Sequence, residues 1–257
     1  MMTYMVTGSR WVVLSKFREV GIRRVVLMMV AFAHCLLSLQ VSAQLGGSFP
    51  WQSELHTAHE LIGRIWDSRR GQFVTDTELW DTLLESSYVL LGEKHDNPDH
   101  HALQLRVLQA LINADSVDKL TMEMLDNTAS ENLDAFLETR FESEEALKSF
   151  LNWDDQGWNW AYYGGLIQAA HRANVPVSAG NLDAETVMQV YSSPTTAEIE
   201  AVLDAEVMSR LMADIDESHC GLLPESQFPP MVRVQQTRDH TMARSLLLDE
   251  GKNHGLA

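Results

Sequence analysis

Length, composition and charge already limit what this chain can be. Its 257 residues suffice for one large domain or two small ones, and an apolar content of 45% is ordinary for a packed core. The formal charge of −17 is unevenly distributed, because residues 1–43 hold five basic side chains and one acid, a net charge of +4. The other residues therefore carry −21, and a body so acidic argues against nucleic acid as a partner.

Residues 1–43 have the pattern of an export signal. Two arginines precede an apolar run over residues 25–39, which is too short to span a bilayer comfortably, and small residues follow that run. The pattern predicts a cleaved signal peptide over 1–43, a mature chain over 44–257, and a periplasmic or cell-surface location. An uncleaved N-terminal anchor is the alternative. After cleavage Cys220 is the only cysteine, so no intramolecular disulfide can form.

The first part of the mature chain alternates between helical and extended patterns. Apolar spacing predicts an amphipathic helix from Ser53 to Trp66, and a short extended piece is expected over residues 71–74. The T-x-x-E pattern at residues 75–78 predicts a capping box at the start of the next helix. The continuous apolar run from Tyr88 to Gly92 then suits a strand that is buried on both faces.

The same alternation of strand and helix continues to the end of the chain. A helix is expected from Pro98 to Ile112, strands from Lys119 to Met124 and from Pro176 to Asn181, and a last helix from about Pro230 to Leu248. Strands that alternate with helices imply right-handed crossovers. The sequence therefore predicts a single α/β domain with a mostly parallel sheet of three or more strands, flanked by helices on both faces.

Polar residues follow each of the three expected strands. The first strand leads into Glu93 and His95, the second ends at Glu123, and the third ends at Asn181. Ligands bind beyond the carboxyl ends of parallel strands, because loops and helix N-termini converge there. We therefore expect these four side chains to share one rim of the sheet.

A helix start directly after the first strand adds two histidines to this rim. Asn97 is the expected cap and Pro98 the first helical residue, so neither needs a functional explanation. His100 and His101 follow, and with His95 they lie near the positive end of the helix dipole. This position favours neutral imidazoles, which can act as ligands or bases.

The segment from Trp153 to Tyr163 is unusually aromatic. Packing on the core is the simpler interpretation of its tryptophans. A flat apolar ligand would also need such walls, and a phenolate from Tyr162 or Tyr163 can ligate ferric haem. In the last helix Arg238 precedes Asp239; the two form an intrahelical charge pair or face the cleft.

These motifs, in this order, resemble the ChaN-like haem-binding family over roughly residues 60 to 250. The matching segments are Gly92 to His101, Glu123-Met124, Trp153 to Tyr163, Ala179 to Asn181, His219 to Gly221 and Gln236 to Ala243. The wider superfamily includes the TIKI and TraB proteins and resembles erythromycin esterases. The resemblance implies an exported haem-binding protein associated with iron uptake, in which a dimer encloses paired haems with tyrosine as iron ligand.

The resemblance also assigns roles to individual residues. Tyr163 is the expected iron ligand and Tyr162 the alternative, a histidine would hydrogen-bond a haem propionate, and Arg238 would neutralise one. A homodimer and an outer-membrane haem or iron receptor are the partners it implies. The residues expected to contact the cofactor are Tyr163, Tyr162, His100, His101, Asn181 and Arg238.

A metal-dependent hydrolase of the same superfamily is the alternative function. Glu93 and His95 would hold a divalent metal, whose bound water would be the nucleophile, and Glu123 would complete the catalytic set. The family continues into another strand that ends in a second G-x-x-H, whereas residues 251–254 match only the short pattern. The chain therefore looks truncated at its C-terminus, which favours a haem-binding protein over an enzyme.

Overall fold

The computed structural model describes residues 49–54, 58–193 and 205–247. All of these belong to one of the two units into which the chain divides, residues 44–257. The predicted signal peptide and the pattern at residues 251–254 lie outside the described residues. In the described ranges no helix combines the length and apolar character needed to cross a bilayer.

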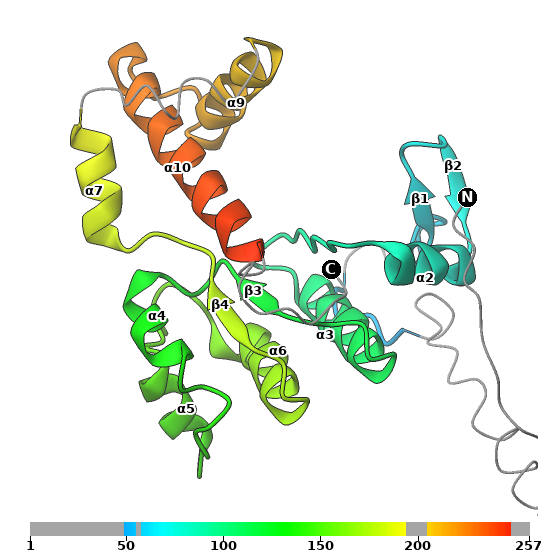
Figure 1. Ribbon diagram of the computed structural model, residues 1–257. Coiled ribbons are helices and arrows are strands. Elements are labelled where there is room, and N and C mark those ends of the chain that lie inside the picture. Colours follow the sequence, from blue (N-terminus) through cyan, green and yellow to red (C-terminus); the bar gives the residue numbers. More distant parts are fainter. Residues whose placement is uncertain (1–48, 55–57, 194–204, 248–257) are drawn as a thin grey trace, which may run out of the picture. The chain divides into compact units, whose positions relative to one another are not determined.

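A β-hairpin begins at the end of the segment for which the sequence pattern predicts the first helix. Strands β1 (Ile65–Asp67) and β2 (Gln72–Val74) pair antiparallel, with Trp66 opposite Phe73 (Figure 1). Gly71 closes the turn at a φ of +66°, a conformation that favours glycine. The predicted helix over Ser53 to Trp66 is wrong for the described residues, because residues 53–54 and 58–64 form no helix and residues 65–66 belong to β1. The extended piece over residues 71–74 is confirmed as β2.

Helix α2 (Asp76–Glu85) begins at the predicted capping box. The Thr75 hydroxyl accepts from the Glu78 N–H at 3.2 Å, and the Glu78 carboxylate accepts from the Thr75 N–H at 2.9 Å. These two bonds satisfy N–H groups that the first helical turn leaves without partners. The prediction is confirmed.

The apolar run from Tyr88 to Gly92 is not the predicted buried strand. No described strand pairs with it, and Leu90 and Leu91 are 72% and 39% exposed. The side chain of Gln104 donates to the Leu91 carbonyl at 3.0 Å. Side-chain contacts of this kind hold the segment in place of a ladder of backbone hydrogen bonds.

The sheet that positions the site has two described strands. Strands β3 (Leu120–Met122) and β4 (Val177–Ala179) lie side by side in parallel, with Thr121 opposite Ser178 (Figure 1). The fold is thus α/β with a parallel pair, and a third strand of this sheet is not found among the described residues. Gly180 allows the two strands to approach closely, because a Cβ there would lie 3.1 Å from the Met122 carbonyl oxygen.

The two faces of this pair differ in character. Met122, Val177 and Ala179 point into the apolar core, which α6 (Trp160–Arg172) also lines. On the other face the Thr121 and Ser178 hydroxyls hydrogen-bond to each other at 2.8 Å. This alternation follows from the period of two along a strand, and it presents the polar face to α10 (Phe228–Leu246).

The C-terminal end of α10 is tied to this polar face. Lys119 Nζ donates to the carbonyl oxygens of Ser245 and Leu247 at 2.8 and 2.9 Å, and the Thr121 hydroxyl lies 3.3 Å from the Ser245 oxygen. A cation at a helix C-terminus satisfies carbonyls that have no partner within the helix. Lys119 therefore fixes the position of α10 along the strands.

The remaining helices surround these elements. Helix α3 packs on α6, where Gly165 leaves room for Leu105; a Cβ at Gly165 would lie 3.2 Å from that side chain. The predicted helices near residues 98–112 and 230–248 are confirmed with small shifts at their ends. The bounds are α3 (Pro98–Asn113), α4 (Asn127–Leu133), α5 (Glu144–Phe150), α7 (Ala184–Ser192), α9 (Ala205–Ser218) and the 3₁₀ helix η1 (Glu225–Gln227).

Candidate functional site

The carboxylate of Glu93 is the centre of a buried polar cluster. Its Oε1 accepts from the Tyr163 hydroxyl at 2.5 Å and lies 2.8 Å from His95 Nδ1. Its Oε2 lies 2.7 Å from His101 Nδ1. The Glu93 side chain is only 5% exposed although it comes from a loop. An ionised carboxylate so deep needs such partners, because burial without them is very costly.

His101 joins this cluster to the aromatic segment. Its Nε2 lies 3.0 Å from the His95 carbonyl oxygen, and its ring stacks on Tyr162 with centroids 4.3 Å apart. The contact between His101 Nδ1 and Glu93 Oε2 is short, yet neither atom makes a hydrogen bond of good geometry. Buried polar atoms in native proteins are usually satisfied. This incomplete pairing marks the cluster as a candidate site.

Tyr163 is a core residue whose surroundings keep it protonated. Its side chain is almost fully buried. Burial raises the pKa of its hydroxyl, and the hydrogen bond to Glu93 with the negative charges of Glu93 and Glu123 raises that pKa further. Iron ligation by tyrosine requires the phenolate, so this environment opposes the role expected for Tyr163 and favours a supporting one.

Tyr162 has the opposite character. Its ring is half-buried with one face on His101, and its hydroxyl makes no hydrogen bond to any described residue. The two tyrosines are adjacent on α6, and a helix turns about 100° per residue, so their side chains point in different directions. The geometry leaves Tyr162, the second choice from sequence, as the tyrosine free to meet a ligand.

His100 is oriented by the loop that carries Glu93. The predicted cap is present, because Asn97 Oδ1 accepts from the N–H groups of Asp99 and His100 at 2.9 and 3.3 Å. His100 Nδ1 accepts from the Lys94 N–H at 2.9 Å. This bond places the proton of a neutral ring on Nε2, which is then the nitrogen able to donate to a ligand.

Asp99, in contrast, serves the structure of the helix start. It is 4% exposed, and its two carboxylate oxygens accept from the backbone N–H groups of Gln52 and Ser53 at 2.6 and 3.0 Å. Burial raises the pKa of Asp99, but these N–H groups outweigh it and hold the pKa below its ordinary value. The carboxylate thereby anchors residues 49–54 to α3.

A cavity of about 370 Å³ lies at the carboxyl ends of β3 and β4. Asn181 Nδ2 donates to the Glu123 carbonyl oxygen at 3.1 Å, which joins the two strand ends. Arg238 reaches the cavity from α10, and its buried Nε has no hydrogen-bond partner among the residues that the structure describes. The lining residues are Glu123, Met124, Leu125, Asp126, Leu151, Asn152, Asp154, Trp158, Asn181, Leu182, Ala184, Val187, Met188 and Arg238.

Trp158 connects this cavity to the Glu93 cluster. Its ring lies edge-on to His95 and to Tyr163, with centroid distances of 5.1 and 5.8 Å, and it also lines the cavity. Glu123, on the cavity wall, is near enough to influence the pKa of Tyr163. Trp158 thus lies between the Glu93–His95 pair and the cavity that Glu123 and Asn181 line, even though residues 88–92 do not form the first of the three expected strands.

Some residues that line the cavity were not predicted from the sequence. The tryptophans of the aromatic segment were expected to pack on the core, which they do, but Trp158 also lines the cavity. Val187 and Met188 of α7 line it as well and were not singled out. The available signal was the short connection after Asn181, which starts α7 at the rim of the sheet.

The structure gives limited support to a metal centre at Glu93 and His95. Among residues 49–54, 58–193 and 205–247, no group of three or more His, Cys, Asp or Glu side chains is placed to hold a metal ion. The reason is visible at Glu93, where both imidazoles direct Nδ1 at the carboxylate itself.

Comparison with known proteins identifies the family. The family model described as haem-binding uptake, Tiki superfamily, ChaN matches residues 79–256. The chain belongs to this family. A solved structure described as cofacial heme binding to ChaN of Campylobacter jejuni is also similar, with 25% sequence identity and a TM-score of 0.62, over 73% of this chain and 76% of that chain. A search of curated proteins gave no match. Membership of the ChaN family confirms the resemblance on which the sequence reasoning relied.

Proposed function

We propose that this ChaN-family protein binds haem, with Tyr162 as the iron ligand and with the cavity beside Trp158 and Arg238 as part of the binding site, and that it serves haem or iron uptake outside the cytoplasm. Family membership supports haem as the ligand. The structural observation that carries the proposal is the buried Arg238 Nε without a partner, in a cavity with Trp158 and Met188 on its walls. This combination of an unpaired cation and apolar surface fits a flat apolar ring that carries carboxylates.

The charges at the rim decide which groups would hold the propionates. The body of the chain is strongly acidic, so a dianionic porphyrin needs a local cation. Arg238 supplies one, and a guanidinium binds carboxylates through paired hydrogen bonds. His100 Nε2 and the Asn181 amide are uncharged groups that could also donate hydrogen bonds to a propionate. His101 is buried and contacts Glu93 instead.

Tyr162 is the proposed iron ligand. Haem supplies a ferric iron that a tyrosine phenolate can ligate. Tyr162 is half-buried on α6 and has no hydrogen bond to a described residue, while Tyr163 donates its proton to Glu93. Tyr163 then acts as a positioning residue, since it holds Glu93 and thereby the ring of His101 on which Tyr162 stacks.

Titration of the purified protein with ferric haem tests the proposal. A shifted Soret band with a phenolate-to-iron charge-transfer band is expected. Tyr162→Phe should abolish the charge-transfer band, Tyr163→Phe should retain it, and Tyr88→Phe, at an exposed tyrosine outside the site, is the matched control. No binding at all would refute the function. Loss of the band in Tyr163→Phe but not in Tyr162→Phe would refute the ligand assignment alone.

Arg238 has a separate test. Arg238→Gln keeps a polar side chain of similar length but removes the charge, and loss of a charge-assisted hydrogen bond of about 1.5 kcal/mol weakens binding about tenfold. The Soret position should not move, because the iron ligand is unchanged. Unaltered haem affinity would show that Arg238 does not contact a propionate.

The setting of this activity is also a proposal. Residues 1–43 support export to the periplasm or cell surface, and a homodimer and an outer-membrane receptor are the partners that haem uptake would require. Cell fractionation of the full chain should recover it outside the cytoplasm. Gel filtration with and without haem should show a dimer in the loaded form. Cytoplasmic recovery would contradict export, and a haem-loaded monomer would contradict the dimer.

A metal-dependent hydrolase is the second candidate. One observation favours it: Glu93 Oε2 and His101 Nδ1 are buried and lack hydrogen bonds of good geometry. His95 and Glu123 would complete the set, with a carboxylate as base. Metal analysis of the purified protein, followed by ester and peptide hydrolysis assays with Mn²⁺, Co²⁺ and Zn²⁺, is decisive. Absence of both bound metal and stimulated hydrolysis would exclude this function.

A further inference from the structure

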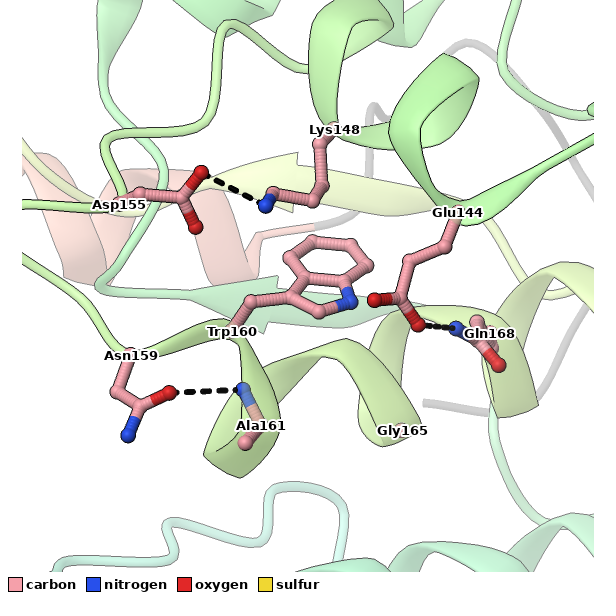
Figure 2. A pocket seen from close by; sticks show the side chains of 8 residues that line it. All are labelled: Glu144, Lys148, Asp155, Asn159, Trp160, Ala161, Gly165 and Gln168. Carbon is pink, nitrogen blue, oxygen red and sulfur yellow. Dashed lines mark hydrogen bonds and ion pairs between the residues drawn. The ribbon is translucent and has the colours of Figure 1, made fainter.

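A second, larger cavity of about 810 Å³ lies beside α6 (Figure 2). Helix α6 contributes Ala161, Gly165 and Gln168 to its wall, whereas neither Tyr162 nor Tyr163 lines it. The other walls come from α5 and the loop before α6. The lining residues are Glu144, Lys148, Asp155, Asn159, Trp160, Ala161, Gly165 and Gln168.

Trp160 presents an unused donor to this cavity. Its side chain is only 7% exposed, and within the described ranges its indole Nε1 has no hydrogen-bond partner. The ring is held in place by Trp153, edge-on at 4.9 Å, and by Gly164, where a Cβ would lie 2.4 Å from the ring. Figure 2 shows the nitrogen directed toward the Glu144 side of the cavity. A buried N–H in this position lacks an acceptor that a ligand can supply.

The polar side chains around Trp160 are held in position by hydrogen bonds and an ion pair. Glu144 Oε2 accepts from Gln168 Nε2 at 3.3 Å, and Lys148 pairs with Asp155 at 2.7 Å (Figure 2). Asn159 Oδ1 accepts from the Ala161 N–H at 3.0 Å, and its amide N–H₂ makes no hydrogen bond to a described residue. One cation and two carboxylates leave the cavity with a net charge of −1, which disfavours an anionic ligand.

We propose that this cavity binds a neutral polyhydroxyl ligand, a short saccharide. A hydroxyl oxygen can accept from Trp160 Nε1 and donate to the Glu144 carboxylate at the same time, which matches a lone N–H opposite an acceptor. The Asn159 amide and Gln168 carbonyl offer a further donor and acceptor to neighbouring hydroxyls. This site is independent of the proposed haem function, since it shares no lining residue with the cavity beside Arg238 and contains neither Tyr162 nor Tyr163.

Nitrogen-resolved NMR of the full chain tests the site. The sequence holds seven tryptophans, and Trp160→Phe identifies the indole N–H resonance of Trp160. Titration with maltose, lactose and N,N′-diacetylchitobiose should move that resonance in a saturable manner for at least one sugar. Glu144→Ala should weaken this response about tenfold or more, because it removes a charged hydrogen-bond acceptor. Glu142→Ala, at a side chain 80% exposed and outside the cavity, is the control and should change nothing.

Three results would overturn the proposal. If no sugar moves the Trp160 resonance, a bridging water alone satisfies the indole. If ethanolamine or acetate moves it and the sugars do not, the ligand is an ion. If Glu144→Ala and Glu142→Ala respond alike, the sugar binds elsewhere. Haem titration of Glu144→Ala should match the parent protein, so failure here is distinguishable from failure of the haem proposal.

Discussion

Replacement of Asp99 by Asn tests the anchoring of residues 49–54 on α3. The carboxylate accepts from two backbone N–H groups, of Gln52 and Ser53, at 2.6 and 3.0 Å. Asp99→Asn keeps one oxygen but directs an N–H₂ group at the other N–H, so one charged hydrogen bond is lost. Such a bond contributes about 1.5 to 3 kcal/mol, and we expect the free energy of unfolding to fall by that amount at pH 7.

The pH dependence of this difference has a definite sign. The folded-state pKa of Asp99 lies below its ordinary value of 3.8, so the contribution is fully present above that value. It is lost as the pH falls through the lower, folded-state pKa. Urea unfolding of both proteins between pH 7 and the lowest pH at which they fold should show a constant difference that narrows only below about pH 4. A difference that narrows between pH 7 and 5 would refute the reasoning.

Three further substitutions probe the framework of the site. Tyr163→Phe leaves Glu93 buried without its phenolic donor, so urea unfolding should show a loss of about 1.5 to 3 kcal/mol; an unchanged midpoint would contradict the supporting role. Gly180→Ala places a Cβ 3.1 Å from a β3 carbonyl oxygen and should cost about 1 to 3 kcal/mol in the same assay; an unchanged midpoint would show that the close approach of the strands is not needed. Lys119→Met removes the cation from the α10 carbonyls and should lower stability by about 1 kcal/mol, an effect that high salt reduces; salt-independence would exclude the charge as its cause.

Local signals in the sequence were sufficient where short-range physics decides the structure. The Thr75 capping box and the Asn97 cap are satisfied within a few residues, and both were predicted correctly. The segments 53–66 and 88–92 were not, because their structure depends on partners elsewhere. Trp66 pairs across a hairpin turn, and an apolar run forms a strand only if another strand supplies its hydrogen bonds.

The candidate site divides in the same way. The ends of β3 and β4 could be placed from sequence, since parallel strands share one carboxyl edge, and this brought Glu123 and Asn181 together correctly. The sequence could not assign different roles to Tyr162 and Tyr163, because it does not show which of two adjacent tyrosines is buried. The contact between Tyr163 and Glu93, which helps to distinguish them, joins residues 70 positions apart.

The link between Lys119 and the last turn of α10 has a consequence for the haem contact that we propose for Arg238. The Lys119 ammonium group binds the helix at the Ser245 carbonyl oxygen. Arg238, which lines the cavity, is seven residues earlier, or about 10 Å along the helix axis at 1.5 Å per residue. The fixed C-terminal end of α10 thus determines the position of Arg238 along the helix axis and the direction of its guanidinium group. One residue inserted between these two points would rotate Arg238 by about 100° and turn it out of the cavity, although no residue that lines the cavity would have changed.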